Sequence, residues 1–264
     1  MTFNSVGSRV RNRCRSLMFT SLFRSPVKMR NKTPLVSFSF DDFPRSAYLA
    51  GGAILEAHGF RGTYYASLGL VGQEAPVGKI FSRDDLVSLY SDGHELGCHT
   101  LGHCHAWNTT PGDFEESIIE NRRRLSEVLP HALFKTHSYP ISGPRPHTKL
   151  RVRRHFPCCR YGGQTYNSGV IDRYLLAGYF LERSRHDLDS IKRTIDRNTD
   201  ACGWLILATH DVLETPTRFG CTPRFFEDVV RYASRSGAIV APVGSAWELV
   251  SGLGSYNPTT TPRR

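Results

Sequence analysis

Short apolar runs alternate with helical patterns from Pro34 to about Val250, and this alternation limits the possible folds more than any other feature. Eight runs have the length and composition of β-strands, namely residues 35–40, 63–66, 95–98, 133–138, 156–161, 179–182, 204–209 and 238–243. Because helices separate most of these runs, the strands should form a parallel sheet, and at this number a closed barrel is more economical than an open sheet. We therefore predict one α/β domain, a (β/α) barrel of about seven to eight parallel strands.

Three helices have clear boundaries in the sequence. Ser82 and Asp85 form a capping box that predicts the start of a helix, and Gly93 is placed to end it. An amphipathic pattern covers residues 111–129, and another covers residues 223–236. No internal repeat or low-complexity linker interrupts the chain, which favours a single domain.

The excess of basic residues is concentrated at the two ends of the chain. Lys and Arg number 34 and Asp and Glu number 24, which gives a net charge of +10. Eight basic and no acidic residues lie within residues 1–33, and the last two residues are Arg263 and Arg264. The remaining body holds 24 residues of each sign, so we predict no nucleic-acid groove.

Residues 1–33 are predicted to be a basic, disordered extension that takes no part in catalysis. A secretory signal is not expected, because the apolar run at residues 17–23 is short and lacks a small-residue cleavage site. Three interpretations remain open. The segment is a basic amphipathic stretch in weak contact with an anionic membrane, a transit peptide, or the product of an upstream start codon when Met18 or Met29 is the true first residue.

No run approaches the ~20 apolar residues that a membrane-spanning helix needs, so we expect a soluble protein. The seven cysteines are odd in number and include no CxxC pair, which argues against a disulfide scaffold and favours reduced thiols. We therefore expect a cytoplasmic protein, with its barrel at residues 34–252 and a C-terminal tail at residues 253–264. Nothing in the sequence indicates an oligomeric state.

Two adjacent carboxylates, Asp41 and Asp42, leave the end of the first predicted strand together. Adjacent side chains diverge, so one can bind a metal ion while the other faces a substrate, and the charge of the ion would keep both ionised. The alternative is an aspartate that caps a helix starting near Pro44.

Two histidines four residues apart, His99 and His103, follow the predicted strand at residues 95–98. This spacing places both imidazoles on the same side of a helical turn, where they can bind one ion. Surface histidines or a Cys/His zinc knuckle are the alternatives, but no second Cys/His pair lies at a suitable distance. An open site of two histidines and one carboxylate is therefore favoured.

A further histidine, His210, ends the apolar strand at residues 204–209. It is a plausible proton donor if other strand ends converge on it, although alone it would more often be an ordinary polar strand terminus. In a barrel, three strand ends with such side chains point to one catalytic site.

Three motifs in this chain resemble the first, second and fifth motifs of the polysaccharide deacetylases, the NodB-homology family. They are Ser39-Phe40-Asp41-Asp42, His99-Thr100-Leu101-Gly102-His103 and Leu207-Ala208-Thr209-His210. Their order and spacing agree with the family, and the resemblance runs from about Leu35 to Val250.

The resemblance implies a distorted (β/α) barrel that hydrolyses an N- or O-acetyl group on a carbohydrate with a divalent metal, usually zinc. It implies that Asp42, His99 and His103 bind the metal. It also implies that Asp41 is the general base that deprotonates water on the metal, and that His210 protonates the leaving amine. A histidine near its ordinary pKa of about 6.5 suits that donation.

The third family motif, Arg-x-Pro-Tyr, departs from its usual form in this chain, which reads Tyr139-Pro140-Ile141 without the arginine. Pro140 is expected to hold the loop, and the N–H of Ile141 to donate to the oxyanion. Arg160, at the end of the strand at residues 156–161, is our candidate to replace the arginine; the alternative is a surface arginine.

The fourth family motif, Asp-x3-Trp, is matched formally by Asp200 and Trp204. Asp200 lies unusually close to His210 in the sequence, so Glu182, at the end of the strand at residues 179–182, is an equally good candidate to orient His210. Trp204 is interpreted as a packing residue in the barrel rather than a platform for a sugar.

We predict a metal-dependent deacetylase of an acetylated carbohydrate, with chitooligosaccharide-type substrates first by family resemblance and Zn²⁺ as the expected metal. Residues 76–82 and 140–146 are expected to border the cleft. The alternatives are a non-sugar amide or imide hydrolase on the same barrel and a catalytically silent protein that binds a carbohydrate or a membrane.

Overall fold

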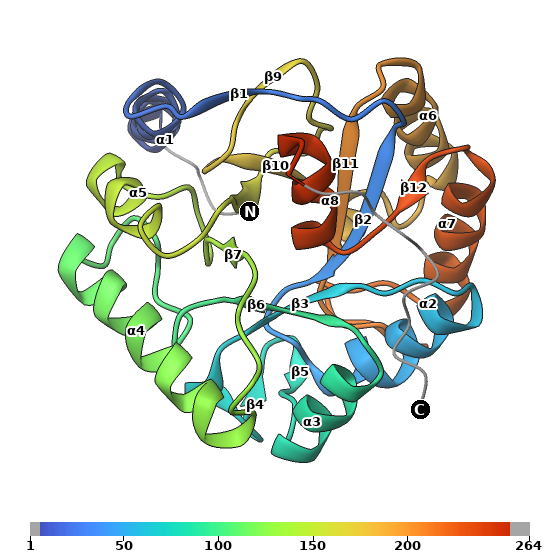
Figure 1. Cartoon of the computed structure of the whole chain (residues 1–264), viewed down its shortest axis with the longest axis horizontal. Helices are drawn as coiled ribbons and strands as arrows, with labels where there is room; N and C mark the ends of the chain where they lie inside the picture. The colour runs from blue at the N-terminus through green and yellow to red at the C-terminus, as the bar shows by residue number, and fades with distance from the viewer. Residues whose placement is uncertain (1–5, 254–264) are drawn as a thin grey trace.

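Seven parallel strands form a closed barrel in the computed structural model, which describes residues 6–253 of the chain, with side chains from residue 13 (Figure 1). In the order of the barrel they are β2 (Leu35–Phe40), β3 (Thr63–Ala66), β6 (Glu95–Cys98), β7 (His137–Ser138), β8 (Cys159–Gly162), β10 (Leu176–Phe180) and β11 (Trp204–Thr209). The barrel closes because β11 pairs with β2 over all six residues of both strands. The predicted (β/α) barrel in a single domain is confirmed.

An eighth strand, β12 (Ile239–Val240), makes the barrel irregular. It pairs with Leu35 and Val36 at the start of β2, whereas β3 pairs with Ser39 and Phe40 at its end. Because β11 pairs along one edge of β2, both β12 and β3 pair along its other edge, β12 at the start and β3 at the end. This division of one edge between two strands makes the barrel irregular at β2.

Several strands are shorter than their apolar runs. Strand β7 contains two residues of the six predicted, and Leu133 in the same run is 74% exposed. Strand β10 ends at Phe180, so Glu182 lies in the 3₁₀ turn η3 (Leu181–Ser184) and not on a strand. An apolar run marks burial, and buried loops and turns carry the same signal as strands.

The helices lie around the barrel, as Figure 1 shows for α3, α4, α6 and α7. Helix α3 (Arg83–Ser91) starts with the predicted capping box, and α4 (Pro111–Val128) and α7 (Pro223–Arg235) match their patterns closely. Beyond a possible helix start near Pro44, the sequence analysis gave no boundaries for the π-helix η1 (Ala47–Gly52), the 3₁₀ turn η2 (Leu68–Leu70), α2 (Ala53–Ala57), α5 (Pro146–Val152), α6 (Leu188–Asp200) and α8 (Val243–Ser251).

One end of the barrel is covered by α8. The N–H of Val243 donates to Thr63 Oγ1 at 2.8 Å, and the N–H of Gly244 donates to the carboxylate of the half-buried Glu95 at 2.9 Å. Thr63 and Glu95 begin β3 and β6, so α8 covers the end of the barrel at which the parallel strands start. The opposite end, where the strands finish, remains available for a site.

The amino-terminal segment, predicted to be a disordered extension, forms secondary structure in its described part. Residues Val6–Ser21 form α1, and β1 (Pro26–Lys28) pairs antiparallel with β9 (Val170–Asp172). Lys149, 1% exposed, forms an ion pair with Asp172 and donates to the carbonyl groups of Phe19 and Leu22 at 3.3 and 3.4 Å. This buried ammonium satisfies carbonyls at the end of α1, a contact between distant segments that composition does not reveal.

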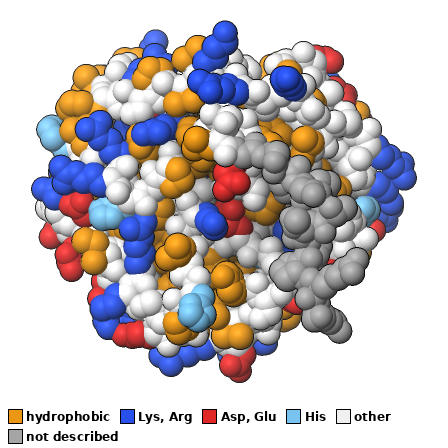
Figure 2. All heavy atoms as spheres, viewed as in Figure 1, with side chains coloured by type: hydrophobic (Ala, Val, Ile, Leu, Met, Phe, Trp, Pro, Cys, Tyr) orange, Lys and Arg blue, Asp and Glu red, His pale blue; other side chains and the backbone are white. Residues whose placement is uncertain are grey.

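The predicted C-terminal tail lies outside the described residues from position 254 onward. Among the described residues, no helix is long and apolar enough to cross a membrane. Figure 2 shows one face of the molecule, over which Lys and Arg side chains are spread among acidic and apolar ones.

Candidate active site

The two adjacent aspartates leave β2 in different directions. Phe38 and Phe40 pack on Phe226 of α7, so even-numbered residues of β2 face the helices and odd-numbered residues face the barrel interior. Asp41 continues the inward row and is 5% exposed. At Asp42 the backbone takes a φ of +61°, a left-handed conformation that is uncommon outside glycine, and the side chain lines a cavity.

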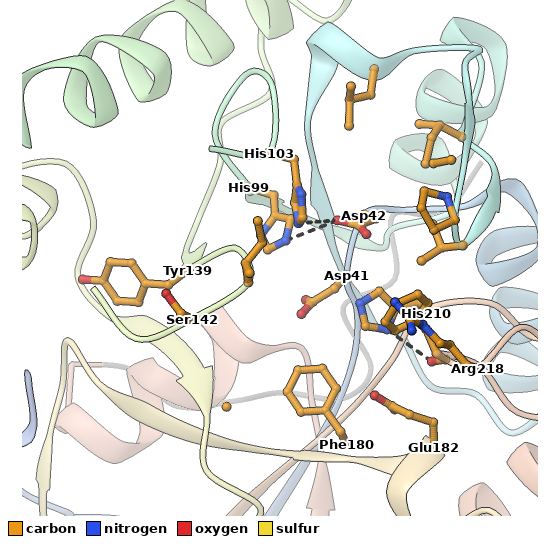
Figure 3. A pocket seen from close by; sticks show the side chains of 18 of the residues that line it. Asp41, Asp42, His99, His103, Tyr139, Ser142, Phe180, Glu182, His210 and Arg218 are labelled. Carbon is orange, nitrogen blue, oxygen red and sulfur yellow. Dashed lines mark hydrogen bonds and ion pairs between the residues drawn. The ribbon is translucent and has the colours of Figure 1, made fainter. Parts of the chain in front are cut away.

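Three potential metal ligands meet at the carboxyl end of the barrel (Figure 3). Asp42 Oδ1 lies 3.4 Å from His99 Nε2 and 3.1 Å from His103 Nε2. Tetrahedral coordination with bonds of about 2.1 Å separates ligand atoms by about 3.4 Å, so this spacing fits one metal ion. Asp42 Oδ1 is also buried without a hydrogen-bond partner, which a metal ion would supply.

The protonation states of these side chains also fit a metal. His99 Nδ1 lies 2.8 Å from the carbonyl oxygen of Ser138, so it carries the proton and Nε2 is left as the ligand atom. Burial and the neighbouring His99 lower the pKa of His103 to about 4, although Asp42 opposes this. Burial would raise the pKa of Asp42, but the nearby histidines lower it below its ordinary value. A neutral imidazole and an ionised carboxylate are the forms that bind metal ions.

The two histidines do not lie on a helical turn, which corrects the local geometry expected from their spacing. Thr100 and His103 both have left-handed backbones, with φ of +63° and +54°. The hydroxyl of Thr100 accepts a hydrogen bond from the N–H of Cys104 at 2.9 Å. A loop stabilised in this way after β6 brings His99 and His103 to the same ion position.

Arg160 occupies the barrel interior beside Asp41. It is 1% exposed, forms an ion pair with Asp41, and donates from Nη2 to Ser138 Oγ at 2.8 Å. Its guanidinium lies 5.0 Å from the ring centroid of Tyr65 and 5.5 Å from that of Phe180. Arg160 is therefore not a surface residue, and it lies where it can orient the carboxylate of Asp41.

The charges around Asp41 and the room left beside Arg160 both favour the Asp41–Arg160 ion pair. Burial alone would raise the pKa of Asp41, but the charges of Arg160, His99 and His210 outweigh it and lower the pKa. On β10, a Cβ atom at Gly178 would lie 2.9 Å from Arg160 Nη1, so a glycine there makes room for the guanidinium. A glycine immediately before a predicted strand is a signal that could have pointed to this close approach.

The loop after β7 contains the predicted oxyanion donor. Tyr139 is buried with its ring 4.9 Å from that of His137, and it lines the cavity. The carbonyl of Pro140 accepts a hydrogen bond from the N–H of Ala106 at 3.3 Å, which ties the loop to the segment after His103. Ile141 has a φ of +69° and lines the cavity, and its N–H has no hydrogen-bond partner among the described residues.

His210 is oriented by the backbone, which corrects the expectation that Glu182 or Asp200 holds it. His210 Nδ1 lies 3.2 Å from the carbonyl oxygen of Phe219, so Nε2 is left free toward the cavity. Asp200 is an exposed residue at the end of α6. Glu182 lines the cavity, but its buried Oε2 has no hydrogen-bond partner, and burial raises the pKa of Glu182 to about 8. A carbonyl partner from the backbone leaves no mark in the sequence.

The loop that carries Phe219 is held by Asp211, whose role the sequence analysis missed. Asp211 is fully buried and accepts hydrogen bonds from the N–H of Thr217 at 2.8 Å and from its hydroxyl at 2.5 Å. A Cβ atom at Gly220 would lie 2.3 Å from Asp211 Cγ, so the loop packs tightly against this carboxylate. Asp211 therefore fixes the loop that presents the Phe219 carbonyl to His210.

Trp204, the other residue of the fourth motif, takes no part in the site. It is fully buried at the start of β11, the opposite end of this strand from His210, and its Nε1 donates to Ser37 Oγ at 3.0 Å. It is a packing residue of the barrel core, as its interpretation proposed.

A cavity of about 740 Å³ joins these groups. Its floor contains the two aspartates, Arg160 and the three histidines, and Phe180, Glu182, Arg183, Arg218 and Phe219 also line it. Pro76, Val77 and Ile80 line it near the hairpin of β4 (Glu74–Ala75) and β5 (Gly78–Lys79), and Ile141, Ser142 and Gly143 line it after β7. Both segments expected to border the cleft do so.

Comparisons with known proteins agree with this fold. Residues 28–155 match the family model described as polysaccharide deacetylase. A search of curated proteins finds no match to the chain. The chitin deacetylase of the fungal pathogen Colletotrichum lindemuthianum has 14% identity and a TM-score of 0.59, over 82% of this chain and 88% of that one.

Two further solved structures are similar. The family 4 carbohydrate esterase from Streptomyces lividans, solved with acetate, has 14% identity and a TM-score of 0.55, over 86% of this chain and 95% of that one. A mutant of a family 4 pseudoenzyme with restored activity has 11% identity and a TM-score of 0.58, over 85% of this chain and 70% of that one. At such identities the likeness concerns the fold.

The family match covers the first two motifs, from β1 through the aspartate pair and the histidine loop to the end of α5. His210, from the segment that resembles the fifth family motif, follows β11 of the same barrel and lines the same cavity. Residues 28–155 of the chain therefore match the polysaccharide deacetylase family model, and the solved structures share the fold of the whole barrel.

Proposed function

We propose that this protein hydrolyses acetyl groups, N-acetyl groups first, from a carbohydrate such as an N-acetylglucosamine oligosaccharide, with Zn²⁺ as its metal. The observation that carries the proposal is the convergence of a ligand triad, a buried Asp–Arg pair and a histidine on one cavity. The match of residues 28–155 to the polysaccharide deacetylase model supports carbohydrate deacetylation as the reaction. The fold alone would not, because a pseudoenzyme shares it.

Asp42, His99 and His103 would hold the ion. Two imidazole nitrogens and one carboxylate oxygen suit zinc, and three protein ligands leave a position for water or substrate. When bound, a divalent ion supplies Lewis-acid polarisation of the acetyl carbonyl and lowers the pKa of the attacking water.

Asp41 is positioned to accept the proton of that water. Arg160 holds the carboxylate in one orientation and keeps it ionised, so it is available as a base at neutral pH. A carboxylate of low pKa is a weak base, which suffices only because the water is made more acidic at the same site.

His210 is positioned to protonate the leaving nitrogen. Its Nδ1–H is bound by the carbonyl of Phe219, so the proton to be transferred is carried on Nε2 of the imidazolium form. An amine leaves as a neutral molecule once protonated, and acetate is the other product. The N–H of Ile141 is available to stabilise the oxyanion.

The non-sugar amide hydrolase was suggested by the altered third motif. Arg160 supplies a guanidinium to Asp41 from β8, so the missing motif arginine no longer favours that alternative. The silent binding protein is disfavoured because each proposed ligand, base and acid is present.

The proposal is tested by acetate release from N-acetylglucosamine oligomers, with and without a chelator. Asp41→Asn should keep its metal but lower turnover by about a hundredfold or more, as the loss of a general base does. His99→Ala should lose both the metal and turnover, whereas His131→Ala, at an exposed residue outside the cavity, should resemble the wild type. Near-normal turnover of Asp41→Asn would reject the assigned base, and chelator-insensitive turnover would reject the metal.

A further inference from the structure

Two arginines, Arg183 and Arg218, line the cavity together with His210, and Figure 3 shows Arg218 beside the imidazole of His210. The ring of His210 lies 5.9 Å from that of Phe180 and 5.4 Å from that of Phe219. A guanidinium group also lies over each phenyl ring. That of Arg183 is 5.8 Å from the ring centroid of Phe180, and that of Arg218 is 4.5 Å from the ring centroid of Phe219. All five side chains line or reach the same cavity.

The segments that carry the two arginines are tied to each other. Arg183 lies in η3, and Arg218 lies in the loop after β11. Arg185 Nη1 donates to the carbonyl of Thr217 at 3.0 Å, and Thr217 is held in turn by Asp211. These bonds fix both segments relative to His210, so the arginines extend from a constrained backbone.

Neither arginine forms an ion pair with an acid in the part of the chain that the structure describes, although the charge of Arg183 acts on the adjacent Glu182. Among the described residues, no ion pair or hydrogen bond engages the guanidinium of Arg183 or Arg218, although both line the cavity and are exposed. Of the acids in the lining, the two aspartates at the base of the cavity are engaged by Arg160 and the histidines. Glu182 is largely uncharged at neutral pH because burial raises its pKa to about 8, and Glu74 lies on the β4–β5 hairpin.

We propose that Arg183 and Arg218 form a subsite for an anionic substituent, a carboxylate or a phosphate, on the acetylated carbohydrate. A guanidinium that stacks on a ring keeps its N–H edge free for paired hydrogen bonds to such oxygens. A neutral sugar would leave the positive charges of Arg183 and Arg218 without an anionic partner. The inference rests on the proposed function for the placement of the sugar, because His210 would face the leaving nitrogen and each arginine contacts a phenyl ring that packs on His210.

Turnover and binding test the subsite separately. The first assay compares KM for acetate release from N-acetylglucosamine, its 6-phosphate and N-acetylmuramic acid, which supply a neutral, a phosphate and a carboxylate substrate. The second compares the Kd values of glucose, glucose 6-phosphate and glucuronate by ligand-observed NMR, because these sugars have no acetyl group to lose. The metal-loaded full chain is used in both assays.

We expect at least one anionic sugar to bind about tenfold more tightly than its neutral counterpart, as exposed charge-assisted hydrogen bonds allow. That preference should fall several-fold in Arg183→Gln and in Arg218→Gln, and disappear in the double variant. Arg224→Gln should keep the preference, because Arg224 is an exposed arginine of α7 outside the cavity and has no ion pair within the described part of the chain. Added salt should weaken the binding of the anionic sugar more than that of the neutral one.

The outcomes separate the two proposals. Equal affinity for neutral and anionic sugars, no binding by any of them, or a preference that survives in the double variant would overturn the subsite. An arginine-dependent preference without acetate release from any substrate would leave the subsite standing and refute the deacetylase. If the phosphate-bearing sugar binds more tightly, the substituent is a phosphate; if the carboxylate-bearing sugar does, it is a carboxylate.

Discussion

The buried pair of Arg160 and Asp41 provides the strongest test of the site geometry. Arg160→Met removes the guanidinium and keeps an unbranched side chain of similar length in the same space. Asp41 then remains in the barrel interior, 5% exposed, without its ion-pair partner. Ser138 Oγ also loses the hydrogen bond that Arg160 Nη2 donates at 2.8 Å.

Arg160→Met should lose much of its stability, because the buried charge of Asp41 is left without a partner. Removing one partner of a buried ion pair costs about 3–5 kcal/mol in the free energy of unfolding. For a domain of this size that corresponds to a fall in Tm on the order of 10 °C. Arg193→Met is a matched control, since Arg193 pairs with Asp187 at 3.7 Å on the surface and such pairs contribute no more than about 1 kcal/mol.

The effect should depend on pH in a defined direction. In the wild type, Arg160 and the histidines lower the pKa of Asp41 below its ordinary value of 3.8. The stabilisation is therefore present above that value and is lost as the pH falls through the lower folded-state pKa. In Arg160→Met, burial raises the pKa of Asp41 relative to the wild type, so the deficit should be largest near pH 7 and shrink as the pH falls toward 5.

Urea denaturation followed by tryptophan fluorescence measures these differences. Arg160→Met, Asp41→Asn and the double variant form a double-mutant cycle at pH 7 and at pH 5. We expect the double variant to be more stable than the sum of the two single losses predicts. Additive losses, or a loss below about 1 kcal/mol in Arg160→Met, would show that the pair is not coupled as the structure indicates.

Three further predictions concern other parts of the chain. Asp211→Ala should lower kcat about tenfold and change its pH profile by releasing the loop that holds His210, and Asp211→Asn should restore part of the rate; unchanged profiles in both would exclude a positioning role. Burial raises the pKa of Glu95 to about 7, above its ordinary 4.5, so wild-type stability should decline by up to about 3 kcal/mol as the pH rises from 5 to 8. In Glu95→Gln, urea denaturation should show that decline removed, and a parallel decline would contradict the assignment. Lys149→Met should expose the end of α1, so that trypsin cleaves faster within residues 13–24; unchanged cleavage would contradict the anchor.

Local patterns in the sequence identified much of this protein. Period-two alternation along β2 places Asp41, directly after the strand, in the row of residues that faces the barrel interior. The capping box at Ser82 defines the start of α3, because its bonds join residues three apart. The spacing of His99 and His103 indicated a shared ion, although a loop and not a helical turn brings them together.

The amino-acid sequence by itself therefore determined the barrel class, the ligand and base candidates and the better-defined helices, since these depend on contacts between near neighbours in the chain. Only the tertiary structure decided which group orients each of them. Arg160 reaches Asp41 across 119 positions of sequence, and Lys149 reaches the end of α1 across 127 to 130. His210 is held by the backbone carbonyl of Phe219, and because every residue offers the same oxygen, the sequence does not indicate which one binds. Such contacts are set by how the strands close around one interior, which no local pattern encodes.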